Sequence, residues 1–452
     1  METRTYSVAS VSRGRQAGCH AARSYRAGGR NLFVRSRPYA ARVHTIGRCA
    51  ALVTALLAFA LGVAACGTPA KTPRATPRAC PASVQPTPAP NAGTSVESAS
   101  AWPAFLHDAR HTGQSPATGP QSGAVRWTRK LERGVSTAPV LAADGTIYVA
   151  SRDGVLHALD PATGDDRWVF DGDGAYGSDL STSALVLPDG TIMWPGPHSQ
   201  LYALDPAGML LWTHPFDSDV LSPALTPGGS VVIVEMSGRL HVLDFDRSGA
   251  RERWSSDLGA SGASFGSPAV GDDGTIYATA GNRIVALRDQ GDSGEILRHF
   301  EIASGTEVSP AVSSDGIAVF GTNDEYEYGV DADGLLWRFP RNSLSFSSPA
   351  VTEAGLAYFG DHNGFMNVVD VESGCLVTRY QGGGEIWTSP AIDARGDVYF
   401  GTKRGHILGF AFDGRKLFDI DTGRTVDSYP AIAADGTLLI GSENGLLYAV
   451  GG

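Results

Sequence analysis

The sequence predicts an all-β fold, an eight-bladed β-propeller of four-stranded antiparallel blades, on three observations. A Ser-Pro-Ala-type run recurs eight times at spacings of 39 to 45 residues. Each copy carries short apolar runs separated by glycine turns, which indicates consecutive hairpins. A period near forty with four strand-like runs is typical of a propeller blade. The aligned positions are Pro139, Ala184, Pro223, Pro268, Pro310, Pro349, Pro390 and Pro430.

The clearest copy spans residues 136–168. Three apolar runs lie at 138–142, 146–150 and 155–159, separated by Asp-Gly pairs at 144–145 and 153–154. Glycine tolerates the positive φ that tight hairpin turns require, so these pairs predict two hairpins in sequence. A fourth strand is expected at 165–170. One sheet of four strands leaves a face uncovered, and the repeated copies supply its neighbours.

Tryptophan recurs on the fourth run, at Trp168, Trp212, Trp254 and Trp337. Large aromatic side chains dominate burial, which predicts that these rings pack between blades. The eighth copy ends at Gly452 without a fourth run. Trp127 lies four residues after Gly123, as Trp168 does after Gly164 and Trp212 after Gly208. We therefore predict that an N-terminal strand completes the eighth blade and closes the ring, which removes two exposed sheet edges.

Charge and cysteine usage exclude two classes of function. Of the 36 Lys and Arg residues, ten precede residue 66, as does one of the 47 acidic residues; the net charge from Cys66 onward is therefore −20. Such an acidic body is a poor candidate for nucleic-acid binding. No CxxC pair supports a zinc or redox site of the usual spacing. The cysteines lie at positions 19, 49, 66, 80 and 375.

The region 1–65 reads as a signal region. Residues 50–65 form an apolar run of sixteen residues after Arg48, which is short for a spanning helix and typical of a signal-peptide core. Residues 1–42 are rich in arginine and precede this core at an unusual length, which a translation start placed too early would explain. The segment Val63-Ala64-Ala65-Cys66-Gly67 resembles the bacterial lipobox, and this resemblance implies lipidation of Cys66. Ordinary secretory cleavage or an uncleaved anchor are the alternatives.

Residues 66–101 form the next region, rich in Pro, Thr, Ala and Ser. Such a composition buries too little apolar surface to order itself, so we expect a disordered tether that holds the body, residues 102–452, away from a membrane. Cys80 in the tether and Cys375 in the body could pair in an oxidising compartment. Nothing in the sequence fixes the geometry that a disulfide needs, so the pairing stays open.

The repeat unit S-P-A-V…D-G-x-[IV]-Y…A-L-D-x-x-T-G-x-x-x-W resembles the pyrroloquinoline-quinone-type (PQQ-like) repeat. The opening Trp102-Pro103-Ala104-Phe105 and Arg110-His111-Thr112-Gly113 resembles the lead-in before such propellers. The resemblance covers about 102–452 and implies the propeller fold, which hosts many functions. One branch contains quinone dehydrogenases, which use calcium, an Asp base and two adjacent cysteines. The other branch includes the lipoprotein propeller of the outer-membrane β-barrel assembly machinery.

The chain lacks adjacent cysteines, and none of the dehydrogenase cofactor residues can be mapped onto it. The lipobox, the tether and the eight plain blades are more similar to the non-enzymatic branch. We therefore expect no catalytic residue, no cofactor and no metal site; PQQ with calcium belongs only to the dehydrogenase alternative.

A candidate binding mouth comes from the positions three residues before the aligned prolines, expected at the start of the innermost strands. Exposed aromatic side chains at a concave mouth often mark a binding surface. The alternative is that these rings plug the narrow end of the channel. The candidate residues are Phe265, Glu307, Phe346, Trp387 and Asp427.

Two further patterns are interpreted as structural. His157, His241 and His406 fall at similar places on third strands, and their separate blades argue against a shared metal site. The acidic loops 171–174 and 324–327 lack the full ligand spacing of an EF-hand, so we interpret them as solvated surface loops.

These observations predict an extracytoplasmic, membrane-anchored propeller that acts as a protein-interaction or scaffold module. We expect a monomeric body, a cell-envelope protein as partner, a lipid anchor in the cell membrane or outer membrane, and no nucleic acid. The alternatives are a PQQ-dependent dehydrogenase and a propeller that senses a ligand or glycan.

Overall fold

The computed structural model describes residues 80, 102–132, 134–135, 137–175, 182–259 and 265–451. The chain divides into two units, 1–71 and 72–452, and all described residues belong to the second. The predictions of a signal region and of lipidation at Cys66 therefore lie outside the described residues. Among the described residues, no helix has the length and apolar character needed to cross a bilayer.

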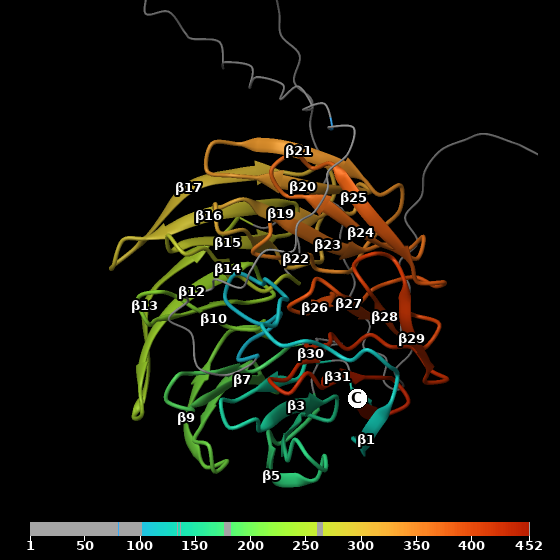
Figure 1. The fold of residues 1–452 in the computed structure, drawn as a ribbon. Helices are drawn as coiled ribbons and strands as arrows, with labels where there is room; N and C mark the ends of the chain where they lie inside the picture. The colour runs from blue at the N-terminus through green and yellow to red at the C-terminus, as the bar shows by residue number, and fades with distance from the viewer. Residues whose placement is uncertain are drawn as a thin grey trace, which may run out of the picture. The chain divides into compact units, whose positions relative to one another are not determined.

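The body is a ring of eight four-stranded antiparallel sheets (Figure 1), as the sequence predicts. Blades one to four contain β2 (Val140–Leu141), β3 (Ile147–Ser151), β4 (Val155–Leu159), β5 (Asp166–Asp171); β6 (Leu185–Val186), β7 (Ile192–Gly196), β8 (Gln200–Leu204), β9 (Leu210–Pro215); β10 (Ala224–Leu225), β11 (Val231–Val234), β12 (Arg239–Asp246), β13 (Gly249–Asp257); and β14 (Ala269–Val270), β15 (Thr275–Ala280), β16 (Arg283–Asp289), β17 (Gly294–Glu301).

Blades five to eight contain β18 (Ala311–Val312), β19 (Ala318–Gly321), β20 (Tyr326–Val330), β21 (Leu335–Pro340); β22 (Ala350–Val351), β23 (Leu356–Gly360), β24 (Phe365–Asp370), β25 (Leu376–Gln381); β26 (Ala391–Ile392), β27 (Val398–Gly401), β28 (His406–Phe410), β29 (Lys416–Asp421); and β30 (Ala431–Ile432), β31 (Leu438–Gly441), β32 (Leu446–Val450), with β1 (Val125–Lys130) as the outer strand. The innermost strand of every blade has only two residues.

The predicted ring closure is confirmed. β1 pairs antiparallel with β32, and Trp127 lies opposite Ala449 across a bulge. Figure 1 shows β1 beside the C-terminal end of the chain. Because the first and last strands share one sheet, the eighth blade holds the two ends of the propeller together.

The recurring tryptophans pack between blades, as predicted. A glycine of the next blade makes room for the rings of Trp127, Trp168, Trp254 and Trp337, whereas Gly249 does not contact Trp212. The Trp127 indole N–H donates to the Pro161 carbonyl of blade one at 3.0 Å, and the Trp168 N–H donates in the same way to Pro206 of blade two. A Cβ on Gly164 would lie 2.5 Å from the Trp127 ring, and one on Gly208 would lie 2.6 Å from the Trp168 ring. The repeated glycine is therefore required for the contact between blades as well as for the turn.

The antiparallel strands place alternate connections at opposite ends of the ring. One end, which we call the lead-in face, carries the turns between first and second and between third and fourth strands. The other, the connector face, carries the turns between second and third strands and the connectors from one blade to the next.

The lead-in, residues 102–118, crosses the centre of the lead-in face as an irregular chain with several turns (Figure 1). Its carbonyl oxygens accept hydrogen bonds of 2.7 to 2.8 Å from the innermost strands of five blades. The donors are the backbone N–H groups of Leu141, Val186, Val270, Val312 and Ile392. Phe105 and Leu106 pack against Ala138 and Tyr429. The lead-in is thus an integral part of the ring's interior.

A disulfide joins Cys80 to Cys375, with 5.5 Å between their Cα atoms. Cys375 is buried in the turn between β24 and β25, on the lead-in face of blade six. The sequence left this pairing open because it could not bring position 80 near position 375. The bond fixes residue 80 to the body, although residue 80 falls inside the segment predicted as a disordered tether.

Candidate functional site

The predicted mouth residues lie in the connectors between blades, and not at the start of the innermost strands as expected. Trp387, for example, precedes β26 by four residues. The reason is that each innermost strand has only two residues and begins one residue after the aligned position, whether that residue is proline or, in blade two, Ala184. The side chains still belong to the connector face.

Three of the five predicted residues are brought together by the fold. The rings of Phe346 and Trp387 meet edge to face, with centroids 4.7 Å apart. His362, in the second turn of blade six, stacks on Trp387 at 5.3 Å. The Lys403 ammonium lies 3.8 Å from the centre of the Trp387 ring, and it pairs with Asp427 at 3.1 Å. We call these five residues the mouth cluster.

Burial decides the charges in the mouth cluster. It lowers the pKa of His362, so this ring is neutral at neutral pH. Burial also raises the pKa of the Asp427 carboxyl, against the opposing effect of Lys403. Within the described part of the chain, His362 Nε2 and Asp427 Oδ1 are buried without a hydrogen-bond partner. The cluster therefore presents two partly exposed aromatic rings and one ammonium group.

The other two predicted residues do not join the mouth cluster. Phe265 is 44% exposed and follows residues 260–264, which are outside the described range. Glu307 is exposed and accepts a long hydrogen bond of 3.4 Å from Asn323. Sequence reasoning missed His362 and Lys403, because only the connectors were compared between copies. Aligning the second turn of each blade would have shown both residues.

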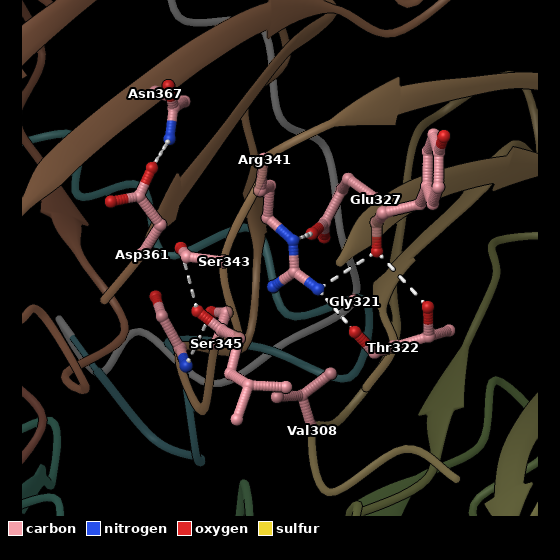
Figure 2. Close-up of polar contacts among 12 residues, drawn as sticks. Val308, Gly321, Thr322, Glu327, Arg341, Ser343, Ser345, Asp361 and Asn367 are labelled. Carbon is pink, nitrogen blue, oxygen red and sulfur yellow. Dashed lines mark hydrogen bonds and ion pairs between the residues drawn. The ribbon is translucent and has the colours of Figure 1, made fainter. Parts of the chain in front are cut away.

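A second unusual feature lies inside blade five, between β20 and the end of β21. Glu327 and Arg341 are both fully buried, and Glu327 Oε2 lies 3.6 Å from Arg341 Nε. Figure 2 shows the guanidinium directed at this carboxyl and at the backbone oxygen of Thr322. Arg341 Nη2 also donates to the Tyr326 carbonyl at 3.0 Å. Burial raises the pKa of Glu327 to about 8, although the nearby Arg341 charge opposes the shift.

The same strand position is aliphatic in the seven other blades. The second residue of the third strand is Leu156, Leu201, Leu240, Ile284, Met366, Ile407 and Leu447 elsewhere. Glu327 is therefore a single polar substitution in a repeated apolar layer. The sequence contained this signal, since the third runs could be aligned on their glycine turns.

The histidines of the third strands each bond to carboxylates of their own blade. His157 Nδ1 lies 3.0 Å from Asp166, and His406 Nδ1 lies 2.6 Å from Asp419. His241 lies between Glu235 and Glu252, at 3.0 and 2.6 Å. Each of these histidines therefore has a structural partner within its own blade.

Comparison with known proteins identifies the family. A family model described as outer membrane protein assembly factor BamB matches residues 109–240, 175–310 and 217–451, which together span well over half of the chain. The chain belongs to the BamB family. No relative among the curated proteins matches the sequence.

Solved structures with the same fold include a BamB and two alcohol-oxidising dehydrogenases. BamB from Moraxella catarrhalis is 15% identical, with a TM-score of 0.57 over 73% of this chain and 97% of that protein. Quinohemoprotein alcohol dehydrogenase from Comamonas testosteroni is 14% identical, with a TM-score of 0.61 over 78% and 80%. A europium-containing methanol dehydrogenase is 12% identical, with a TM-score of 0.59 over 76% and 90%. At these identities the likeness establishes the fold alone.

The described residues of this BamB-family chain do not fit the quinone and calcium that the dehydrogenase branch of PQQ-like propellers would need. Calcium takes six to eight oxygen ligands, yet no cluster of three His, Cys, Asp or Glu side chains among the described residues could hold a metal ion. The two cysteines of the described range pair with each other at the edge of blade six, far along the chain from one another. We therefore derive no chemical step through a quinone.

Proposed function

We propose that this BamB-family protein is an extracytoplasmic, membrane-anchored scaffold whose mouth cluster docks a protein of the cell envelope. The observation that carries the proposal is the cluster of Phe346, Trp387 and Lys403 on the connector face. Partly exposed aromatic rings beside a cation supply contact area at low entropic cost, and such residues dominate binding energy at protein interfaces.

The electrostatics of the cluster favour an acidic or neutral polar segment of the partner. Lys403 is the only cation in the mouth cluster, since His362 is neutral. Its partner Asp427 is drawn toward the protonated form by burial. An incoming carboxylate would accept a charge-assisted hydrogen bond from this ammonium group, beside its contact with Asp427.

The membrane anchor rests on separate evidence. The segment ending in Cys66 and Gly67 has the pattern of a lipobox after an apolar core. The disulfide between Cys80 and Cys375 supports an oxidising compartment outside the cytoplasm. Family membership is consistent with both features.

A glycan-binding role has less support. Sugar recognition by stacking needs a free aromatic face, whereas the Trp387 ring already contacts His362, Phe346 and Lys403. The rings of the cluster are therefore better suited to packing against a protein side chain than to stacking on a sugar.

In-cell photo-crosslinking tests the scaffold role. A photoreactive phenylalanine analogue at position 346 should give one dominant crosslinked envelope protein. The same probe at the exposed outer-strand position 169 serves as the control and should not give that product. Trp387→Ala should abolish the product while leaving the melting temperature of the protein nearly unchanged, since the ring is only half-buried.

Anchoring is measured separately. Cys66→Ser should abolish metabolic labelling with a fatty acid and release the protein from membranes. Loss of anchoring without loss of crosslinking would reject only the membrane part of the proposal. Crosslinks that are identical at positions 346 and 169, or that survive Trp387→Ala, would reject the mouth cluster as the docking site.

A further inference from the structure

A cavity of about 580 Å³ opens on the lead-in face, between the first turns of blades two, three and four. Its floor is apolar and includes Leu187, Leu225, Phe245 and Val270. Protein pockets that bind ligands commonly have volumes of about 300–1,000 Å³ and such apolar linings. The cavity lies at the opposite end of the strands from the mouth cluster.

The cavity lies where the lead-in makes no backbone hydrogen bond to the innermost strand of blade three, and lead-in residues 108–110 form part of its lining. Between Ala104, on blade two, and Ala109, on blade four, the chain makes a tight turn in which Leu106 and His107 have positive φ. Phe105 and Leu106 turn away to pack against Ala138. No carbonyl of the described lead-in bonds to the N–H of Leu225, whereas the equivalent N–H groups of the two adjacent blades are bonded at 2.7 to 2.8 Å.

The lead-in shows how a chain segment docks on this surface. At blades two and four, a backbone carbonyl accepts a bond from the second residue of the innermost strand. Blade three has the same two-residue strand, β10, and the same register with its neighbour β11. Within the described residues, the Leu225 N–H therefore lacks the lead-in acceptor that its equivalents in blades two and four have, and it lies beside an apolar cavity; a short extended peptide can supply such an acceptor.

The charges at the rim favour a basic partner. Asp189 and Asp272 are both exposed and lie on opposite walls, in the first turns of blades two and four. The one cation of the lining, Arg110, is paired with Glu353 and lies 3.4 Å from Asp272. Asp108 accepts bonds from the backbone N–H groups of Arg110 and Thr112 and is itself buried. The rim thus keeps an excess of negative charge.

We propose that this cavity binds an extended segment of a partner protein, in which apolar side chains are flanked by lysine or arginine. The apolar side chains fill the floor between Leu187 and Val270, a backbone carbonyl accepts the Leu225 N–H, and the basic side chains pair with Asp189 and Asp272. The site is distinct from the mouth cluster and gives the ring a second docking surface, on its other face.

Panning the purified full chain against a displayed library of random dodecapeptides tests the proposal. Enriched peptides should share paired apolar residues next to Lys or Arg. Asp189→Lys combined with Asp272→Lys should weaken their binding about 10-fold or more. The same variant should not weaken acidic versions of these peptides, in which each base is replaced by Glu, and this contrast separates loss of charge pairing from loss of folding.

A steric variant provides a second, matched test. Pro188→Trp places a large side chain at the exposed rim and should block the enriched peptides. Ala143→Trp occupies the same position in the first turn of blade one, outside the cavity, and should leave binding intact. Trp387→Ala should also leave it intact, so failure here is separate from failure of the mouth cluster. Peptides that bind equally to the Pro188→Trp and double Lys variants, or a screen that enriches none, would overturn the proposal. The proposal would also be overturned if the chain's own basic segment 67–79 occupied the cavity. In that case, deletion of residues 67–79 would make the enriched peptides bind more tightly.

Discussion

Glu327 and Arg341 form a fully buried acid–base pair, with 3.6 Å between Oε2 and Nε, in a layer that is aliphatic in every other blade. Arg341 Nη2 also donates to the Tyr326 carbonyl at 3.0 Å. Both oxygens of Glu327 lack a hydrogen-bond partner of good geometry among the described residues. The pair replaces an apolar contact and leaves polar atoms unsatisfied, so it is a feature that core packing alone does not favour.

Replacing one member of this pair should lower the free energy of unfolding far more than replacing both. Glu327→Leu or Arg341→Leu alone leaves a buried polar group without its partner and should lower the free energy of unfolding by about 3–5 kcal/mol. The double variant restores the aliphatic layer and should be close to the wild type or more stable. Urea unfolding of the four proteins measures the difference.

Met366→Leu is the matched control, because Met366 holds the same position in blade six and the change conserves volume. It should cost less than about 1.5 kcal/mol. Equal destabilisation by the double variant and by the single variants would show that the pair stabilises the fold through its own attraction.

The same pair predicts a dependence of stability on pH. The folded chain holds Glu327 with a pKa of about 8, against an ordinary value of 4.5. Between these values the folded state keeps a proton that the unfolded state has released. The stabilising contribution is therefore complete below about pH 4.5 and is lost as the pH rises through 8.

Glu327→Gln removes this titration, so it isolates the effect from all other groups. The difference in unfolding free energy between wild type and variant should change with pH by up to about 1.4 kcal/mol per pH unit in this window. Parallel stability curves for the two proteins between pH 5 and 8 would show that folding does not raise the pKa of Glu327.

The period of the repeat was sufficient to predict the ring and its closure, because all eight copies recur at 39 to 45 residues with the same order of apolar runs and glycine turns. Trp127 could be assigned to blade eight from its distance to Gly123 alone, and it lies in β1 beside β32. The predicted strand 155–159 also coincides with β4. Local patterns repeated eight times outweigh the ambiguity of any single copy.

The site was less predictable because it depends on contacts between copies. Phe346 and Trp387 could be selected because both lie in connectors. His362 lies sixteen residues after Phe346, and Lys403 lies sixteen residues after Trp387, in turns of a different kind. The disulfide partner of Cys80 lies 295 residues further along the chain. The cavity on the lead-in face lies where the lead-in turns and makes no backbone hydrogen bond to the innermost strand of blade three, and no residue type in that turn signals a cavity.

The contact between Trp127 and Gly164 predicts that a glycine-to-alanine substitution lowers stability more at position 164 than at position 316. Gly164 has a φ of +74°, and a Cβ there would lie 2.5 Å from the indole ring. Gly316 has a φ of +80°, but a Cβ there would meet nothing within 4 Å. Both substitutions pay the backbone cost of about 1 kcal/mol, and Gly164→Ala must in addition displace the ring.

In thermal unfolding, the melting temperature of Gly164→Ala should therefore be well below that of Gly316→Ala. The additional loss should disappear in the background of Trp127→Ala, which itself costs about 3–5 kcal/mol by opening the contact between blades eight and one. Equal losses at the two glycines, with Trp127 intact, would contradict the proposed packing.

The disulfide between Cys80 and Cys375 predicts a redox-dependent stability. It closes a loop of almost 300 residues, and cross-links of long loops typically contribute about 2–4 kcal/mol. Reduction should therefore lower the urea midpoint of the protein. Non-reducing peptide mapping of chain purified from an oxidising compartment should recover residues 80 and 375 in one linked product.

The variant Cys80→Ser with Cys375→Ser provides the control for reduction. Its urea midpoint should match that of the reduced wild type and should not respond to a reductant. Because Cys375 is buried, the single variant Cys80→Ser should leave a thiol that reacts slowly with an alkylating reagent in the folded state and rapidly in urea. Rapid alkylation of Cys375 in the untreated wild type would show that the bond is absent and that residue 80 is not attached to blade six.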